Sequence, residues 1–220
     1  MASTMTAGQA LDIVSMRYKG LQQEGFGPRF ADEVQAYIWY RFPWRQSLSE
    51  LPPFHPVLEE PDYGPPTSAV PPDFYGFHDV WLRYRDGSTK TLTPMKDLAV
   101  SPVAGIPEAI SYQAERYSFR LYPRPSITAP EWWVEGIYKK TPTKITTANV
   151  NSYLIPWDDL YFAVFRQGLI WKVKDEILGD PAAPGEFAKF ETFVQRMAAA
   201  EGMQLGVTIV HPHSGLELGG

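Results

Sequence analysis

Apolar positions at the two ends of the chain recur at the three- and four-residue steps of amphipathic helices. This period predicts four helices. The first, second and fourth run over about 7–24, 29–42 and 184–202, and the third begins at Pro156 and stops before Gly179. That third stretch is apolar almost all the way round, so it must be covered by other helices. The two N-terminal helices are the best candidates for that cover.

Residues 44–155 instead show the two-residue alternation of β-strands, interrupted by many prolines. Asp86-Gly87 is a favoured hairpin turn, and residues 114–116 are expected to form a second one. Proline pairs mark 52–72 as an extended loop with one short strand near Val57. The strands predicted around the two turns are 77–84, 89–92, 109–113 and 117–122, and a further strand over 132–138 is expected to continue the sheet of the second hairpin.

These patterns together predict an α+β fold. A four-helix bundle would be built from both chain ends, 7–43 and 156–202. A Pro-rich loop and a mostly antiparallel β-hairpin insertion would occupy 44–155, and an extended C-terminal tail would follow over 203–220. The tail is polar, bounded by glycine and has one β-branched run, so we expect it to be poorly ordered in the free subunit.

The composition favours a protein with many surface contacts. The 220 residues are 44% apolar and 20% charged, which is ordinary for a globular protein, but they include 21 prolines and 14% aromatic residues. Tyr and Trp in such numbers are favoured at protein interfaces. Trp132 and Trp133 are adjacent in a predicted strand, so one is expected in the core and the other outside it.

Other features bound the class of function. There are no cysteines, which excludes disulfides, zinc–thiolate sites and a thiol nucleophile and suggests a reducing compartment. The N-terminus does not resemble a signal peptide and no apolar run could span a membrane, so a soluble protein made inside the cell is expected. A net charge of −5 disfavours tight binding to nucleic acid.

Candidate acidic sites are few. Asp158 and Asp159 follow Pro156 in the first turn of a predicted helix, where the helix dipole favours acids, and adjacent helical residues do not face each other as an acid–base pair would. A second acidic group consists of Glu59, Glu60 and Asp62 and has the composition of a solvated loop edge, with a cation site as the alternative.

The basic and histidine candidates are equally sparse. His211 and His213 flank Pro212 without a nearby third metal ligand, and a basic cluster formed by Lys139, Lys140 and Lys144 would be a weak patch. The chain has no Gly-rich phosphate loop, nucleophile elbow or His-Glu-x-x-His motif. We therefore expect no enzyme, cofactor or metal; an enzyme with a site assembled from scattered Asp, Glu and His is the rival hypothesis.

The ordered succession of several segments resembles the head-to-tail adaptor (connector) proteins of tailed, chiefly short-tailed, phages. These segments are Val70-Pro71-Pro72-Asp73-Phe74, Gly105-Ile106-Pro107, Phe119-Arg120-Leu121-Tyr122-Pro123-Arg124-Pro125, Tyr138-Lys139-Lys140-Thr141-Pro142 and Leu154-Ile155-Pro156-Trp157. The resemblance covers roughly residues 7–200, with a longer and more Pro-rich stretch over 44–68.

This resemblance implies a virion structural protein at the head–tail junction, assembled in the host cytoplasm. It implies a homo-oligomeric ring of twelve copies that joins the portal protein ring to tail nozzle or tail-fibre proteins, contacts double-stranded DNA only in passage and touches no membrane. We expect portal-binding residues in the tail, where 207–210 could add a strand to a neighbouring sheet; they are Leu205, Val207, Ile209, His211 and Leu216. The alternative is a carbohydrate- or ligand-binding module that uses exposed Trp and Tyr.

Overall fold

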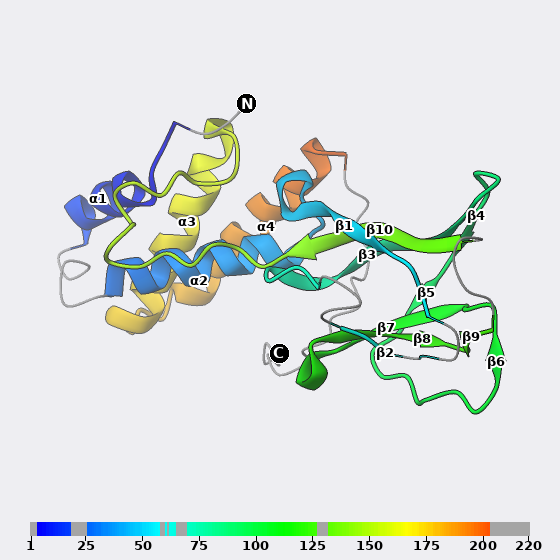
Figure 1. The fold of residues 1–220 in the computed structure, drawn as a ribbon. Helices are drawn as coiled ribbons and strands as arrows, with labels where there is room; N and C mark the ends of the chain where they lie inside the picture. The colour runs from blue at the N-terminus through cyan, green and yellow to red at the C-terminus, as the bar shows by residue number, and fades with distance from the viewer. Residues whose placement is uncertain are drawn as a thin grey trace. The chain divides into compact units, whose positions relative to one another are not determined.

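The computed structural model describes residues 4–18, 26–57, 60, 62–64, 70–126 and 132–202. The chain divides into two compact units (Figure 1). The helical unit takes in the described residues up to Gln46 and from Pro142 onwards, and the β unit runs from Ser47 to Thr141.

The helical unit is organised around its third helix. α3 (Phe162–Lys172) packs against α1 (Ala7–Arg17), α2 (Phe26–Arg41) and α4 (Ala183–Ala200). A 3-10 turn, η3 (Asp159–Tyr161), precedes α3, and a π-helical turn, η4 (Val173–Ile177), follows it. The buried side chains at the centre of this unit are Phe30, Val34, Phe165, Leu169, Phe190 and Val194.

Local chemistry explains where the helices begin and end. The Thr6 hydroxyl accepts a hydrogen bond from the Gln9 backbone N–H, and the Gln9 side chain accepts one from the Thr6 N–H, so α1 starts with a capping box. Gly179 and Gly202 have φ of 55° and 72°, left-handed values that end helical segments.

Three predicted helix boundaries are wrong. α1 ends at Arg17, since Tyr18 is extended; residues 19–25 lie outside the described part. α2 already begins at Phe26, so Pro28 lies in its first turn, where a missing N–H costs no hydrogen bond. The helix expected from Pro156 begins only at Phe162, after the turn η3.

The β unit contains three sheets. The first has the strand order β1-β10-β3-β4, the second β2-β8-β7-β5, and the third pairs β6 with β9. The strands are β1 (Leu48–Phe54), β2 (Asp62–Tyr63), β3 (Phe74–Tyr84), β4 (Thr89–Thr91), β5 (Thr93–Pro94), β6 (Ala104–Gly105), β7 (Ala109–Gln113), β8 (Ser118–Tyr122), β9 (Arg124–Pro125) and β10 (Trp132–Lys140). Pairing is antiparallel except for β5 with β7 and β6 with β9.

The first two sheets share one apolar core. Alternate residues of β3 and β10 are buried, and their register pairs Leu82 with Val134 and Val80 with Gly136. Phe119, fully buried in β8, contacts the rings of Phe74 and Phe77 from β3. The alternating strands therefore bury their apolar faces against each other.

The α+β class holds, but the predicted four-helix bundle with a hairpin insertion is wrong. The described residues form four α-helices and ten strands in three sheets, and the β unit has a core of its own. The helices cluster around α3 rather than form a bundle, and the buried side of α3, with Val164, Phe165 and Leu169, is what the other helices cover. The predicted division into domains, 7–43 with 156–202, 44–155 and 203–220, stays a prediction.

Some of the predicted strands and hairpins are confirmed and others are wrong. Both predicted hairpins are confirmed, as β3–β4 around Asp86-Gly87 and β7–β8 around the 3-10 turn Ala114–Arg116. The short strand near Val57 is wrong, since the strand is β1, which includes Pro52 and Pro53. Proline is tolerated there because β1 is an edge strand, where a missing backbone N–H need not break a hydrogen bond of the sheet. β10 was expected to continue the sheet of the second hairpin, but it pairs with β1 and β3.

Candidate functional site

The predicted portal-binding residues, Leu205, Val207, Ile209, His211 and Leu216, lie outside the described residues, as do His213 and the expectation about order in the tail. That part of the hypothesis stays a prediction. The remaining candidate residues, apart from Glu59, have structural surroundings that can be compared with their predicted roles.

The two adjacent aspartates act at different places. Asp158 is the N-cap of η3, where its carboxylate accepts a hydrogen bond from the Leu160 N–H at 3.1 Å, so its predicted role at a helical start is confirmed. Asp159 instead accepts hydrogen bonds from the backbone N–H and the hydroxyl of Thr4, at 2.9 and 2.6 Å, and from the Met5 N–H. It holds the N-terminal segment against η3, a role that the helix pattern does not predict.

Asp62 holds two segments of the β unit together. Its carboxylate accepts two hydrogen bonds from Arg120, at 2.5 and 2.7 Å, and one from Arg116 at 3.1 Å. Arg120 also donates to the Leu98 carbonyl at 2.9 Å. The hydrogen bonds from Arg120 are the main reason that the pKa of Asp62 is lowered. The solvated edge predicted here is therefore wrong for Asp62; Glu59 lies outside the described residues.

The predicted three-lysine cluster is also wrong. Lys139 is fully buried in β10, and burial lowers its pKa from 10.5 to about 7. Lys140 is half-buried and Lys144 is exposed. In the described part of the chain, no group of three or more His, Asp or Glu side chains is placed to hold a metal ion. No helix among the described residues has both the length and the apolar character needed to cross a membrane.

The outer face of the first sheet carries two tryptophans held by one carboxylate. Glu135 accepts hydrogen bonds from the indole N–H groups of Trp133 and Trp81 and from the Arg83 guanidinium, the last two at 3.2 Å. The bond from Trp133 is the largest reason that the pKa of Glu135 is lowered. Trp81, Arg83 and Trp133 are half-buried, whereas Trp132 is buried in the core, as its position next to Trp133 predicted.

We refer to Trp81, Arg83, Trp133 and Glu135 as the tryptophan face. The register places Glu135 opposite Trp81 and Trp133 opposite Arg83, so the four side chains share one side of β3 and β10. Trp and Arg are the residues most often found at the energetic centres of protein interfaces. The sequence shows each strand's alternation, but the contact with Glu135 depends on pairing across about fifty residues and was missed.

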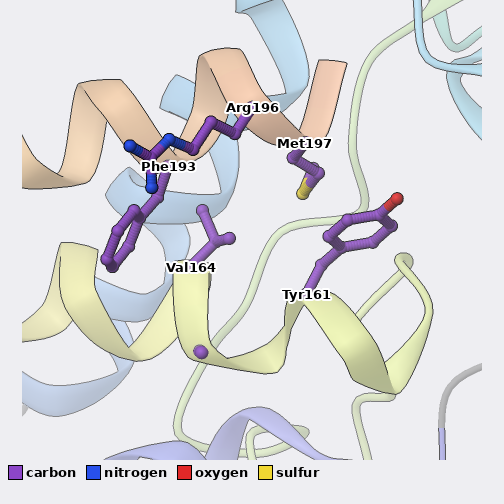
Figure 2. A pocket seen from close by; sticks show the side chains of 6 residues that line it. Tyr161, Val164, Phe193, Arg196 and Met197 are labelled. Carbon is purple, nitrogen blue, oxygen red and sulfur yellow. The ribbon is translucent and has the colours of Figure 1, made fainter. Parts of the chain in front are cut away.

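The helical unit carries an open apolar groove of about 260 Å³ (Figure 2). Its lining comes from η3, α3 and α4 and consists of Tyr161, Ala163, Val164, Phe193, Arg196 and Met197. Figure 2 shows Tyr161 and Met197 at one end and Phe193 with Arg196 at the other. Leu160, on the turn that leads into the groove, is 82% exposed. The lining of this α3/α4 groove is apolar apart from Arg196 and the Tyr161 hydroxyl.

Comparison with known proteins identifies the chain. A search of curated proteins found no match. The family of SU10 adaptor proteins, in contrast, matches residues 16–209, which is most of the chain. This agrees with the resemblance found in the succession of sequence segments. The chain belongs to the SU10 adaptor protein family, a family of phage head–tail adaptors that are structural proteins and not enzymes.

Proposed function

We propose that this chain is the subunit of an oligomeric ring, of twelve copies, that joins the capsid portal to the tail and lets genomic DNA pass. The observation that carries the proposal is the family match over residues 16–209. In this proposal the ring contacts the portal protein on one side and tail nozzle or tail-fibre proteins on the other. It assembles in the host cytoplasm.

The charge of the subunit supports a passage for DNA. The chain has a net charge of −5, so a ring of many copies is strongly negative overall. Like charge discourages the phosphate backbone from adhering to the channel wall. DNA can then move through the ring without being held there.

The surfaces of both units support a role in assembly. The tryptophan face is rigid before any partner binds, because Glu135 fixes both indole rings and Arg83. A preorganised aromatic surface loses little side-chain entropy on docking. Its indole N–H groups already donate to Glu135. In the proposed role the partner is a protein, so a glycan array should show no binding, and specific glycan binding lost in Trp81→Ala would support the alternative carbohydrate-binding module instead.

We propose that the C-terminal tail binds the portal. In an extended strand Leu205, Val207, Ile209 and His211 point to one side, and Thr208 points to the other. Added to a sheet edge on the portal, such a strand gains affinity from main-chain hydrogen bonds and specificity from the alternate side chains.

The test mixes the purified chain with portal rings and measures occupancy by native mass spectrometry. Wild-type protein should bind as twelve copies. Deleting 205–220 should abolish or strongly weaken binding, and Val207→Asp with Ile209→Asp should do the same. The matched control Thr208→Asp should bind nearly as wild type, and all variants should keep the wild-type thermal unfolding. Full portal occupancy by the truncated chain would show that the tail is not the docking element.

A further inference from the structure

The tryptophan face continues into an acidic row at one end of the first sheet. The register pairs Glu50 of β1 with Ile137 of β10, and Ile137 with Asp79 of β3, so these three side chains form a row on the outer side of the sheet. Trp81 and Arg83 follow Asp79 at the two-residue steps that keep side chains on one side of a strand. The outer face is therefore acidic at the Asp79 end and aromatic at its centre.

The other end of the same face is the β3–β4 hairpin turn, and it carries a free positive charge. Arg85 directly follows β3 and is exposed. The neighbouring Asp86 is held by the turn itself, because its carboxylate accepts hydrogen bonds from the Ser88 N–H and hydroxyl at 2.8 and 2.6 Å. Arg85 is thus the cation that this end offers to a partner.

The charges at the two ends are accessible. Asp79 has a side chain that is 63% exposed, with the His78 ring 3.5 Å from its carboxylate. Among the described residues, no ion pair or hydrogen bond involves the side chain of Glu50 or of Arg85, and both residues are exposed. Thr89 and Thr91 of β4 are exposed along the side of the face. A second protein surface can therefore reach both charged ends.

The order of side chains along β3 is complementary to itself after a two-fold rotation. Asp79 and Arg85 lie three residues to either side of Leu82, and about 20 Å of strand separates them. A two-fold axis that crosses the strands beside Leu82 places a second copy face to face with the first and reverses its strand direction. Asp79 of each copy then lies over Arg85 of the other, and Trp81 lies over Arg83 of the other, as in a cation–π pair. An axis parallel to the strands would instead bring like charges together.

We propose that two copies of this chain associate through the outer face of the first sheet, about a two-fold axis that crosses the strands. Each copy contributes the same patch, so the contact is isologous and closes on two copies. The inference goes beyond the proposed ring, which needs a repeated contact between two different patches, because it describes the free chain before the ring assembles. Trp81, Trp133 and Ile137 exclude water at the centre, and the Asp79–Arg85 pairs set the direction.

Charge reversal tests the pairing, with the dissociation constant of the full-chain dimer measured by sedimentation velocity across a concentration series. Asp79→Arg and Arg85→Glu should each weaken dimerisation about tenfold or more, because each variant brings like charges together at both ends of its dimer. An equimolar mixture of the two variants should dimerise about as tightly as wild type, since both contacts of the mixed dimer then join opposite charges. Arg166→Glu, a change of the same kind at an exposed position of α3, is the control and should dimerise as wild type.

The mixture separates this contact from a loss of folding, because two misfolded variants would not restore each other. Single variants that dimerise as wild type, or a mixture no tighter than either variant alone, would overturn the proposal. A wild-type chain that stays monomeric at every concentration would also overturn it, even if that chain fills portal rings. A wild-type dimer that never binds portal rings would instead overturn the proposed function alone.

Discussion

Gly168 marks the closest approach of α3 to its neighbours, and replacing it with alanine tests how tightly the helical unit is packed. A Cβ atom at this position would lie 2.5 Å from Val34 Cγ1 of α2 and 2.9 Å from Phe190 Cε2 of α4. Both neighbours are fully buried in the core, so neither can rotate freely out of the way. Alanine must therefore push α3 away from α2, α4 or both.

The expected change in the free energy of unfolding comes from two opposing effects. Overpacking a well-filled core costs about 1–3 kcal/mol. Replacing glycine with alanine inside a helix gains about 0.5–1 kcal/mol. Gly168→Ala should therefore lower the free energy of unfolding by up to about 2.5 kcal/mol. Gly185 in the first turn of α4 is the matched control, since no atom lies within 4 Å of its ideal Cβ position. Gly185→Ala should leave stability unchanged or raise it by up to about 1 kcal/mol.

The assay is urea unfolding followed by far-UV circular dichroism, which reports on the helices. A double-mutant cycle with Val34→Ala separates steric conflict from other effects. Val34→Ala should cost less stability in the Gly168→Ala background than in wild type, because it removes the methyl group that alanine meets. The reasoning is refuted if Gly168→Ala is as stable as Gly185→Ala, or if the two substitutions are additive.

Further predictions concern the packing of the helical unit and the buried Lys139. Phe165→Ala should destabilise the protein by about 3–5 kcal/mol, since Phe165 is 1% exposed, whereas Leu160→Ala, at an 82% exposed position, should change it by less than about 0.5 kcal/mol. Trp171→Ala removes ring contacts with Tyr37, Phe187 and Phe190. It should lower the free energy of unfolding by about 3–5 kcal/mol in the same denaturation assay, and a loss below about 1 kcal/mol would contradict this. Burial lowers the pKa of Lys139 in the folded protein to about 7, so between pH 7 and 10 this lysine binds a proton more fully in the unfolded chain than in the folded one. The free energy of unfolding should therefore rise with pH over this range, by at most about 1.4 kcal/mol per pH unit. Lys139→Met should lose this rise between pH 7 and 9, and equal slopes in both proteins would contradict the explanation.

Local sequence signals predicted the elements that depend on neighbouring residues. The spacing of Phe190, Val194 and Met197 in α4 is visible in the sequence because one face of a helix repeats every three or four residues. The β3–β4 hairpin was predictable because Asp86-Gly87 adopts the turn, with Gly87 at φ 88°. The family resemblance was also visible, as an ordered succession of such short segments.

Contacts between distant segments were not predictable. Nothing near Lys139 in the sequence shows that it is fully buried, and its position beside two other lysines suggested a surface patch. The same is true of Glu135, whose partner Trp81 is fifty-four residues away. The bundle prediction failed for the same reason, since an apolar helix requires cover but does not specify how its neighbours are arranged.

The sequence by itself determined the presence and order of the four helices, the two hairpins and the phage adaptor family, because each depends on periodicity, turn chemistry or the order of short segments. Only the tertiary structure decided that β10 pairs with β1 and β3, that Asp62 binds Arg120, and that η3, α3 and α4 enclose a groove. These contacts join residues far apart in the chain. Their free energy comes from burial and register across many side chains at once, which no local pattern contains.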